Sequence, residues 1–146
     1  EHRLLEAQAA HHDRLAVRIG FDEGLAHRLE AGADMLVMPS RYEPCGLTQL
    51  HSLRYGTVPI VRRTGGLADT VVPFKPSTAQ ANLATGFHFG EVSSDALLTA
   101  ILLALSVYRQ RETWRSLMRA GMSLDLSWAR SARRYEHLYR SLFQKR

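Results

Sequence analysis

The sequence predicts an α/β domain: a partial Rossmann-like parallel sheet of about four strands, with flanking helices and a helical C-terminus. Three observations predict this class. Short apolar runs alternate with helix-compatible segments over roughly the first 90 residues, as in repeated strand–helix units. The run Met35 to Met38 has no polar alternation, which is typical of a strand covered on both faces. The rest of the chain has helical periodicity.

The first part of the chain is expected to alternate between helix and strand. A weakly amphipathic pattern opens it, and the apolar run from Leu15 to Ile19 ends at a glycine. Asp22 or Glu23 suits the start of a helix that Gly32 ends. The expected elements are a helix over 4–12, a strand over 15–19, a helix from 22 or 23 to 32, and a strand over 35–38.

Glycine and proline divide the middle of the chain. A helix from about Gly46 is expected to end at Gly56, and Gly65-Gly66 opens a turn into a short helix. The segment between Pro73 and Thr85 is rich in turn-forming residues and indicates a loop. The expected order is a helix from 46, a strand over 58–61, a helix over 67–72, a loop over 73–85 and a strand over 86–89.

Three helices are expected at the C-terminal end. Ser93-Ser94-Asp95 caps a run over 96–108 that is apolar nearly all round, which predicts a helix covered on two sides. A second helix is expected around Trp114. A third begins near Ser127 and carries an aromatic stripe that includes Trp128, Tyr135 and Tyr139.

Composition narrows the class of protein. The 146 residues are 45% hydrophobic and 23% charged, as in a folded globular domain rather than a disordered chain. No apolar run reaches the roughly 18 residues that cross a bilayer. About four strands are fewer than a doubly wound domain usually has, and the sequence begins without Met, so we expect a fragment whose first strands lie upstream.

The net charge of +5 comes from the C-terminal end, where residues 109–146 hold ten Lys/Arg and three Asp/Glu. We interpret these charges as solvated helix faces, with an acidic partner or a nucleic acid as alternatives. Five histidines (11, 12, 27, 51 and 88) show no metal-ligand spacing with Cys or acids, so the sequence predicts no zinc site. Dinucleotide, P-loop and serine-hydrolase motifs are also missing from the sequence.

Three strand-to-helix junctions are expected at the same edge of the parallel sheet, at residues 20–23, 40–48 and 62–66. Ligands bind at such an edge because loops and helix N-termini meet there. Backbone N–H groups around Leu47 and Thr48 suit a phosphate. Glu43 suits sugar hydroxyls, Gly46 permits close approach of the backbone, and Phe21 suits stacking on a base. These types of residue together predict a nucleotide-sugar site.

The chain resembles the bacterial glycogen synthase branch of the glycogen and starch synthase family. The resemblance lies in the segments Pro39 to Leu50, Tyr55 to Pro59, Arg63 to Val71, Thr85 to Phe89 and Ser127-Trp128, which occur in the family's order. It implies a GT-B fold of two Rossmann-like domains. Residues 1–146 are then a partial C-terminal domain that binds the donor nucleotide sugar, with C-terminal helices over about 94–143.

The resemblance also implies an activity. The family transfers glucose from ADP-glucose to the non-reducing end of an α-1,4-glucan with retention of configuration, in the cytoplasm and with no metal or other cofactor. The implied partners are the glucan and an N-terminal GT-B domain across a cleft, with no nucleic acid and no membrane.

Site residues follow from the resemblance by position. Glu43 matches the catalytic glutamate beside the donor glucose, where it would stabilise and orient rather than attack. The other matches are Cys45 and Gly46 with the donor sugar, Leu47 and Thr48 with the diphosphate, and Phe21 with the adenine.

Three features bear on how far the resemblance extends. The position eight residues after Glu43, a second glutamate in wider retaining families, is His51, which fits the glycogen synthase branch but leaves His51 without an assigned role. Arg63 to Leu67 is not the Lys-Thr-Gly-Gly-Leu motif of the N-terminal domain. The Arg and Lys expected to neutralise the diphosphate are missing from this sequence, so the chain alone is expected to be inactive. In the family the last helix packs on the N-terminal domain, so the aromatic stripe packs either there or on its own domain.

Two alternatives to an ADP-glucose-using glycogen synthase stay open at this point. One is a glycosyltransferase that uses UDP-glucose or builds another glucan, because no residue here is seen to recognise the base by hydrogen bonds. The other is a non-catalytic glucan-binding or interaction module that keeps the same fold.

Overall fold

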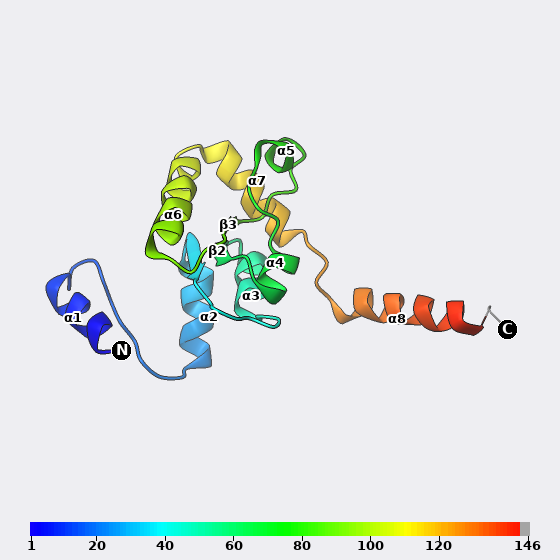
Figure 1. Cartoon of the computed structure of the whole chain (residues 1–146), viewed down its shortest axis with the longest axis horizontal. Helices are drawn as coiled ribbons and strands as arrows, with labels where there is room; N and C mark the ends of the chain where they lie inside the picture. The colour runs from blue at the N-terminus through cyan, green and yellow to red at the C-terminus, as the bar shows by residue number, and fades with distance from the viewer. Residues whose placement is uncertain (144–146) are drawn as a thin grey trace.

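The computed structural model describes residues 1–143. Eight helices and three strands occur in those residues (Figure 1). Their order is α1 (His2–Ala10), α2 (Glu23–Gly32), β1 (Met35–Met38), α3 (Thr48–Tyr55), β2 (Val58–Arg62), α4 (Gly65–Thr70), α5 (Pro76–Gln80), β3 (Phe87–Phe89), α6 (Ser94–Tyr108), α7 (Arg111–Met122) and α8 (Trp128–Phe143).

The three strands form one parallel sheet in the order β1-β2-β3. The central strand β2 aligns Ile60 with Val37 on one side and with Phe87 on the other. Its first four residues are buried, as expected for a strand with neighbours on both edges and helices on both faces. The predicted parallel α/β architecture is therefore confirmed, with three strands in the described residues instead of about four.

The missing strand is the segment from Leu15 to Ile19, which was predicted as a strand but forms no ladder within residues 1–143. Its Val17 N–H donates to the side-chain oxygen of Gln8 in α1. Figure 1 shows this part of the chain running from α1 to α2 at one side of the sheet. A strand requires a partner for its backbone groups, and apolar composition alone supplies none.

Several helices begin or end at the capping residues and glycines that the sequence predicted. The Asp22 side chain accepts a 2.9 Å hydrogen bond from the Leu25 N–H at the start of α2. Ser93 accepts one of 3.2 Å from the Ala96 N–H at the start of α6. Gly56 ends α3 in the left-handed conformation, with φ of 86°, which glycine adopts without steric penalty.

Helix α5 lies inside the segment 73–85 that was predicted as a loop. Pro76 occupies the first turn, where a missing N–H is tolerated. The Thr78 hydroxyl accepts a 2.9 Å hydrogen bond from the Lys75 N–H, which closes that turn. Five residues of helix therefore form in a stretch whose composition indicated irregular structure.

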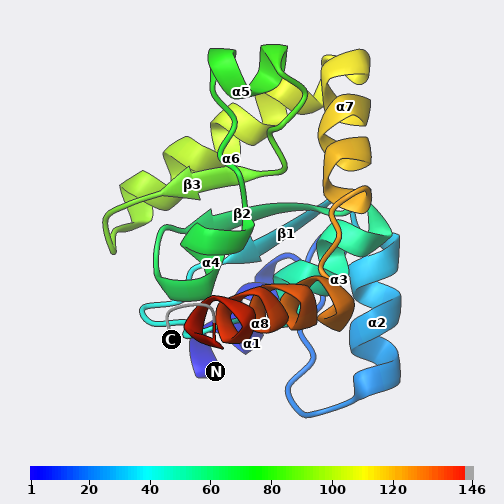
Figure 2. The same cartoon turned by 90° about the vertical axis from the view of Figure 1, so that its right-hand side faces the viewer.

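Helices cover both faces of the sheet (Figure 2). On one face, α6 and α7 enclose a core with residues of β2 and β3; on the other, Leu67 of α4 and Val71 pack on Val61. Members of the first cluster include Val58, Ile60, Phe87, Phe89, Ala100, Ala104, Val107, Trp114 and Leu117.

Helix α6 differs from its prediction. The apolar pattern predicted a helix covered on two sides, but α6 buries only the face that carries Ala100, Ala104 and Val107. Four leucines on the remaining surface are between 41% and 57% exposed: Leu98, Leu102, Leu103 and Leu105. Within residues 1–143 the helix has only one packed side.

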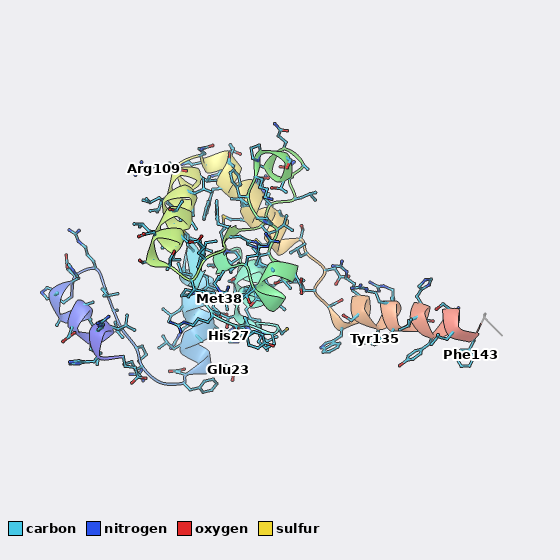
Figure 3. All side chains as sticks on the ribbon, in the orientation of Figure 1. Glu23, His27, Met38, Arg109, Tyr135 and Phe143 are labelled. Carbon is cyan, nitrogen blue, oxygen red and sulfur yellow. The ribbon has the colours of Figure 1, made fainter. Side chains whose placement is uncertain are left out.

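Helix α8 buries none of its sixteen residues (Figures 1 and 3). Trp128, Tyr135 and Tyr139 are 86%, 60% and 58% exposed. The alternative in which this aromatic stripe packs on its own domain is therefore wrong for the described residues. None of the helices in residues 1–143 combines the length and apolar character needed to cross a membrane.

Candidate functional site

The loop between β1 and α3, residues 39–47, lies at the carboxyl edge of the sheet. The turn 63–64 between β2 and α4 and the segment 90–93 after β3 leave the same edge, because all three strands run in parallel. Two of the three predicted junctions thus meet as expected. The third, residues 20–23, does not follow a strand in the described structure.

Arg62 and Gln49 hold the backbone of the loop in place. The Arg62 Nε donates to the Ser40 carbonyl at 2.6 Å, and its Nη2 donates to the Arg41 carbonyl. The Gln49 Nε2 donates to the Cys45 carbonyl at 2.8 Å. Because Gln49 is fully buried and Arg62 lies at the end of the central strand, the loop conformation is coupled to the core.

Gly65 and Gly66 permit a close approach of α4 to the loop. The Gly66 N–H donates to the Glu43 carbonyl at 3.0 Å. A Cβ on Gly66 would lie 2.6 Å from the Cys45 carbonyl carbon, and one on Gly65 would lie 3.0 Å from that of Glu43. Both approaches are too short for a side chain to be present, so this pair of glycines sets the position of the loop.

Glu43 lies half-buried in this loop. Its backbone carbonyl accepts a hydrogen bond from the Gly66 N–H, whereas its carboxylate makes no hydrogen bond or ion pair with any residue in 1–143. Cys45 is an exposed free thiol, and the following Gly46 has φ of 72°. The carboxylate is thus available to a ligand while the backbone beside it is fixed.

Leu47 and Thr48 mark the start of α3. The helix begins at Thr48 rather than at 46, with Leu47 as its N-cap residue. The first N–H groups of a helix have no acceptor within the helix and attract anions. Both residues are exposed and adjoin the loop that carries Glu43.

Phe21 is separate from the other predicted residues. Its side chain is 95% exposed, so it packs on neither the loop nor the sheet. The structure brings Glu43, Cys45, Gly46, Leu47 and Thr48 together on one supported segment and leaves the predicted base-stacking residue in solvent.

Four supporting residues were missed by sequence reasoning: Gln49, Arg62, Gly65 and Gly66. Two signals in the sequence could have indicated a supporting role: the glutamine in the first turn of α3 and the arginine at the end of an apolar strand. Both place a polar side chain where apolar ones are expected. Arg62 donates to carbonyl groups 22 and 21 residues away, contacts that no local pattern encodes, whereas the Gln49 contact spans only four residues.

Comparison with known proteins identifies similar chains. Residues 4–119 match the sequence family described as glycosyl transferases group 1. The chain is 58% identical over 142 residues to the glycogen synthase of Anaeromyxobacter dehalogenans strain 2CP-C, and 54% identical over 134 residues to glycogen synthase 1 of Methylococcus capsulatus. These alignments cover 97% and 92% of this chain, but 29% and 27% of the relatives. The chain therefore spans less than a third of their length.

Two solved structures share the fold. The catalytic domain of starch synthase IV from Arabidopsis thaliana, bound to ADP and acarbose, superposes with a TM-score of 0.82 at 38% identity, covering 94% of this chain and 28% of that one. The sucrose-phosphate synthase of Thermosynechococcus elongatus gives a TM-score of 0.64 at 26% identity, over 99% of this chain and 35% of that one. The resemblance to glycogen and starch synthases is thereby confirmed.

Proposed function

Because the chain belongs to the glycosyl transferases group 1 family, we propose that the intact protein is a glycogen synthase. It transfers glucose from ADP-glucose to the non-reducing end of an α-1,4-glucan with retention of configuration. The 58% identity to a glycogen synthase over 97% of the chain carries this proposal. The starch synthase neighbour, which binds ADP and acarbose, supports an adenine nucleotide as the donor.

The supported loop accounts for how donor binding would work. N–H groups of Leu47 and Thr48, at the N-terminus of α3, bind the diphosphate, and the Thr48 hydroxyl adds a donor. Cys45 and Gly46 contact the glucose. Phe21 stacks on the adenine. Because the Phe21 side chain is exposed to solvent in this structure, the adenine or other residues have to come into contact with it when the donor binds.

Glu43 would act on the transition state. The bond from the anomeric carbon to the diphosphate breaks while a bond to the acceptor hydroxyl forms on the same face, and the leaving diphosphate takes the acceptor's proton. Positive charge develops on the sugar ring, and the Glu43 carboxylate stabilises it without forming a covalent bond. No metal or other cofactor takes part.

The proposal assigns residues 1–146 to part of the C-terminal, donor-binding domain of a GT-B enzyme, with the helices at about 94–143 included. An N-terminal domain supplies the other wall of the cleft and the glucan site, so this chain alone is inactive. The same assignment places the protein in the cytoplasm, without nucleic acid or membrane as a partner.

Incorporation of labelled glucose into glycogen by the intact protein tests the activity. We expect transfer from ADP-glucose and much less from UDP-glucose. A preference for UDP-glucose would contradict the donor assignment only. No transfer from any nucleotide sugar by a folded, intact protein would contradict the enzyme assignment and favour a non-catalytic glucan-binding module.

The Glu43→Gln variant of the intact protein tests the catalytic role. Loss of one preorganised charge at the developing cation should lower kcat on the order of 10²- to 10³-fold, with a smaller change in donor KM. Glu112→Gln is the matched control, because that carboxylate is 81% exposed on α7 and its only ion pair among residues 1–143 is with Arg115. Equal kcat values for Glu43→Gln and wild type would exclude the assigned role.

A further inference from the structure

Three potential metal ligands meet between α2 and α3, one turn along α3 from the loop that carries Glu43: the His51 N–H donates to the Leu47 carbonyl at 2.9 Å. His27 and Glu30 lie one turn apart on α2, and His51 lies on α3. One ligand atom from each of the three residues falls within 4.8 Å of the other two. Figure 3 labels His27 on α2, and Figures 1 and 2 both show α3 beside that helix.

The carboxylate at the centre of this cluster is buried and unsatisfied. The Glu30 side chain is 9% exposed, and its Oε2 has no hydrogen-bond partner among the described residues. Nδ1 of His51 lies 3.6 Å from this oxygen and Nδ1 of His27 lies 3.7 Å from it, both beyond hydrogen-bond length. A buried carboxylate oxygen that accepts no hydrogen bond is unfavourable, so a cation between these three atoms would remove a penalty.

We propose that His27, Glu30 and His51 bind a divalent transition-metal ion of the Zn²⁺ class. Two imidazoles and one carboxylate form a common three-ligand zinc set that leaves one position open. Ligand atoms around tetrahedral zinc lie roughly 3.3 Å apart, given bond lengths of about 2.0–2.2 Å. The separations of 3.6 and 3.7 Å between Glu30 and the two histidines require movement of only a few tenths of an ångström. The two imidazole nitrogens lie within 4.8 Å of each other, so they would approach by up to about 1.5 Å to reach this spacing.

The surroundings suit an ion that can enter and be held. The side chains of His27 and His51 are 36% and 43% exposed, which leaves a route for the ion and a water ligand. The Tyr55 hydroxyl lies 3.3 Å from the same His27 nitrogen, so metal binding at that nitrogen replaces this contact.

The backbone behind the cluster is firmly anchored. The Thr57 hydroxyl contacts the Glu30 carbonyl and donates to the Ala33 carbonyl at 2.9 Å. These bonds join the C-terminal end of α2 to the start of β2. An ion bound to His27, Glu30 and His51 therefore cross-links two helices that already pack together, and acts as a structural clamp on α3. It takes no part in glucose transfer, so the inference does not rest on the proposed function.

Zn²⁺ titration of the metal-free intact protein, in competition with a chromophoric chelator, tests the site. We expect one equivalent to bind in the wild type and to be lost, or weakened at least tenfold, in the His27→Ala/His51→Ala variant. His12→Ala and His137→Ala are matched controls, because both imidazoles are exposed and lie outside the cluster; they should bind as the wild type does. An unchanged equivalent in the double variant would overturn the proposal.

Two further readouts separate a metal site from a folding defect. Co²⁺ substitution should give the intense visible absorption of a tetrahedral site in the wild type and not in His51→Ala. The His51 side chain is half-exposed, so we expect this variant to fold, and circular dichroism checks that it does. Zn²⁺ should raise the Tm of the wild type and leave that of His51→Ala unchanged. Equal Tm shifts in both proteins would show binding elsewhere and overturn the proposal.

Discussion

Helices α7 and α8 have the same kind of sequence but different surroundings. Both are strongly amphipathic and rich in arginine. α7 buries Trp114, Leu117 and Gly121 against the rest of the domain, whereas α8 buries no residue within the described chain. Helical periodicity therefore determines that a helix forms and which face is apolar, but it does not determine whether that face has a partner.

Replacing one tryptophan in each helix should give the largest contrast. Trp114 is 5% exposed, stacks on Phe87 with ring centroids 6.3 Å apart and meets Tyr108 edge-on at 5.0 Å. Trp114→Ala should lower the free energy of unfolding by about 3–5 kcal/mol. Trp128→Ala, at a side chain 86% exposed, should change it by no more than about 0.5 kcal/mol.

Urea unfolding of both tryptophan variants measures this difference. If Trp128→Ala destabilised the protein as much as Trp114→Ala, the aromatic stripe of α8 would be packed in the molecule being measured. In the intact protein that outcome would indicate that the stripe contacts residues outside 1–143. The difference between α7 and α8 would then lie in which part of the protein covers each helix.

Two glycines test whether the close packing of the domain extends to the site. Gly66→Ala places a methyl group 2.6 Å from the Cys45 carbonyl carbon and should cost about 1–3 kcal/mol of stability. Gly32→Ala, where no atom lies within 4 Å of the added Cβ, should stabilise the end of α2 by about 0.5–1 kcal/mol. Chemical denaturation measures the stability of both variants, and a donor-binding assay measures their affinity for the nucleotide sugar. Equal effects of the two substitutions would mean that the loop is not held by α4.

The smallest effect concerns His88 on β3. Burial is the main reason that its pKa lies below the ordinary value of 6.5, although a backbone hydrogen bond with Val71 opposes the shift. The unfolded chain thus takes up this proton at higher pH than the folded one. The stabilising contribution is present above pH 6.5 and decreases as the pH falls below it, until the folded histidine is protonated too.

His88→Gln removes that titration. We expect its free energy of unfolding, measured by urea denaturation between about pH 7.5 and 5, to fall less steeply with decreasing pH than that of the wild type. His137→Gln, at an exposed position on α8, serves as the comparison and should keep the wild-type slope. Identical slopes for all three proteins would contradict a shifted pKa at His88.

Much of the site could be predicted because its signals are local. Glu43 to Thr48 follow an apolar strand and precede a helix, so their position at the carboxyl edge follows from parallel topology. Gln49 donates to a carbonyl only four residues away, whereas the supporting contacts from Arg62 and Gly66 join groups that come together only when β1, β2 and α4 are assembled. The same holds for His51, which approaches Glu30 only because α2 packs against α3.

The sequence by itself determined the strands that became β1, β2 and β3, the caps at Asp22 and Ser93, and the left-handed helix end at Gly56. Each depends on the steric and hydrogen-bonding preferences of a few neighbouring residues. Tertiary structure alone decided that, among residues 1–143, the segment 15–19 has no strand partner and α6 is covered on one side, and that His27, Glu30 and His51 share a space. Pairing, burial and side-chain clusters require elements distant in sequence, and a local pattern does not specify which surfaces will meet.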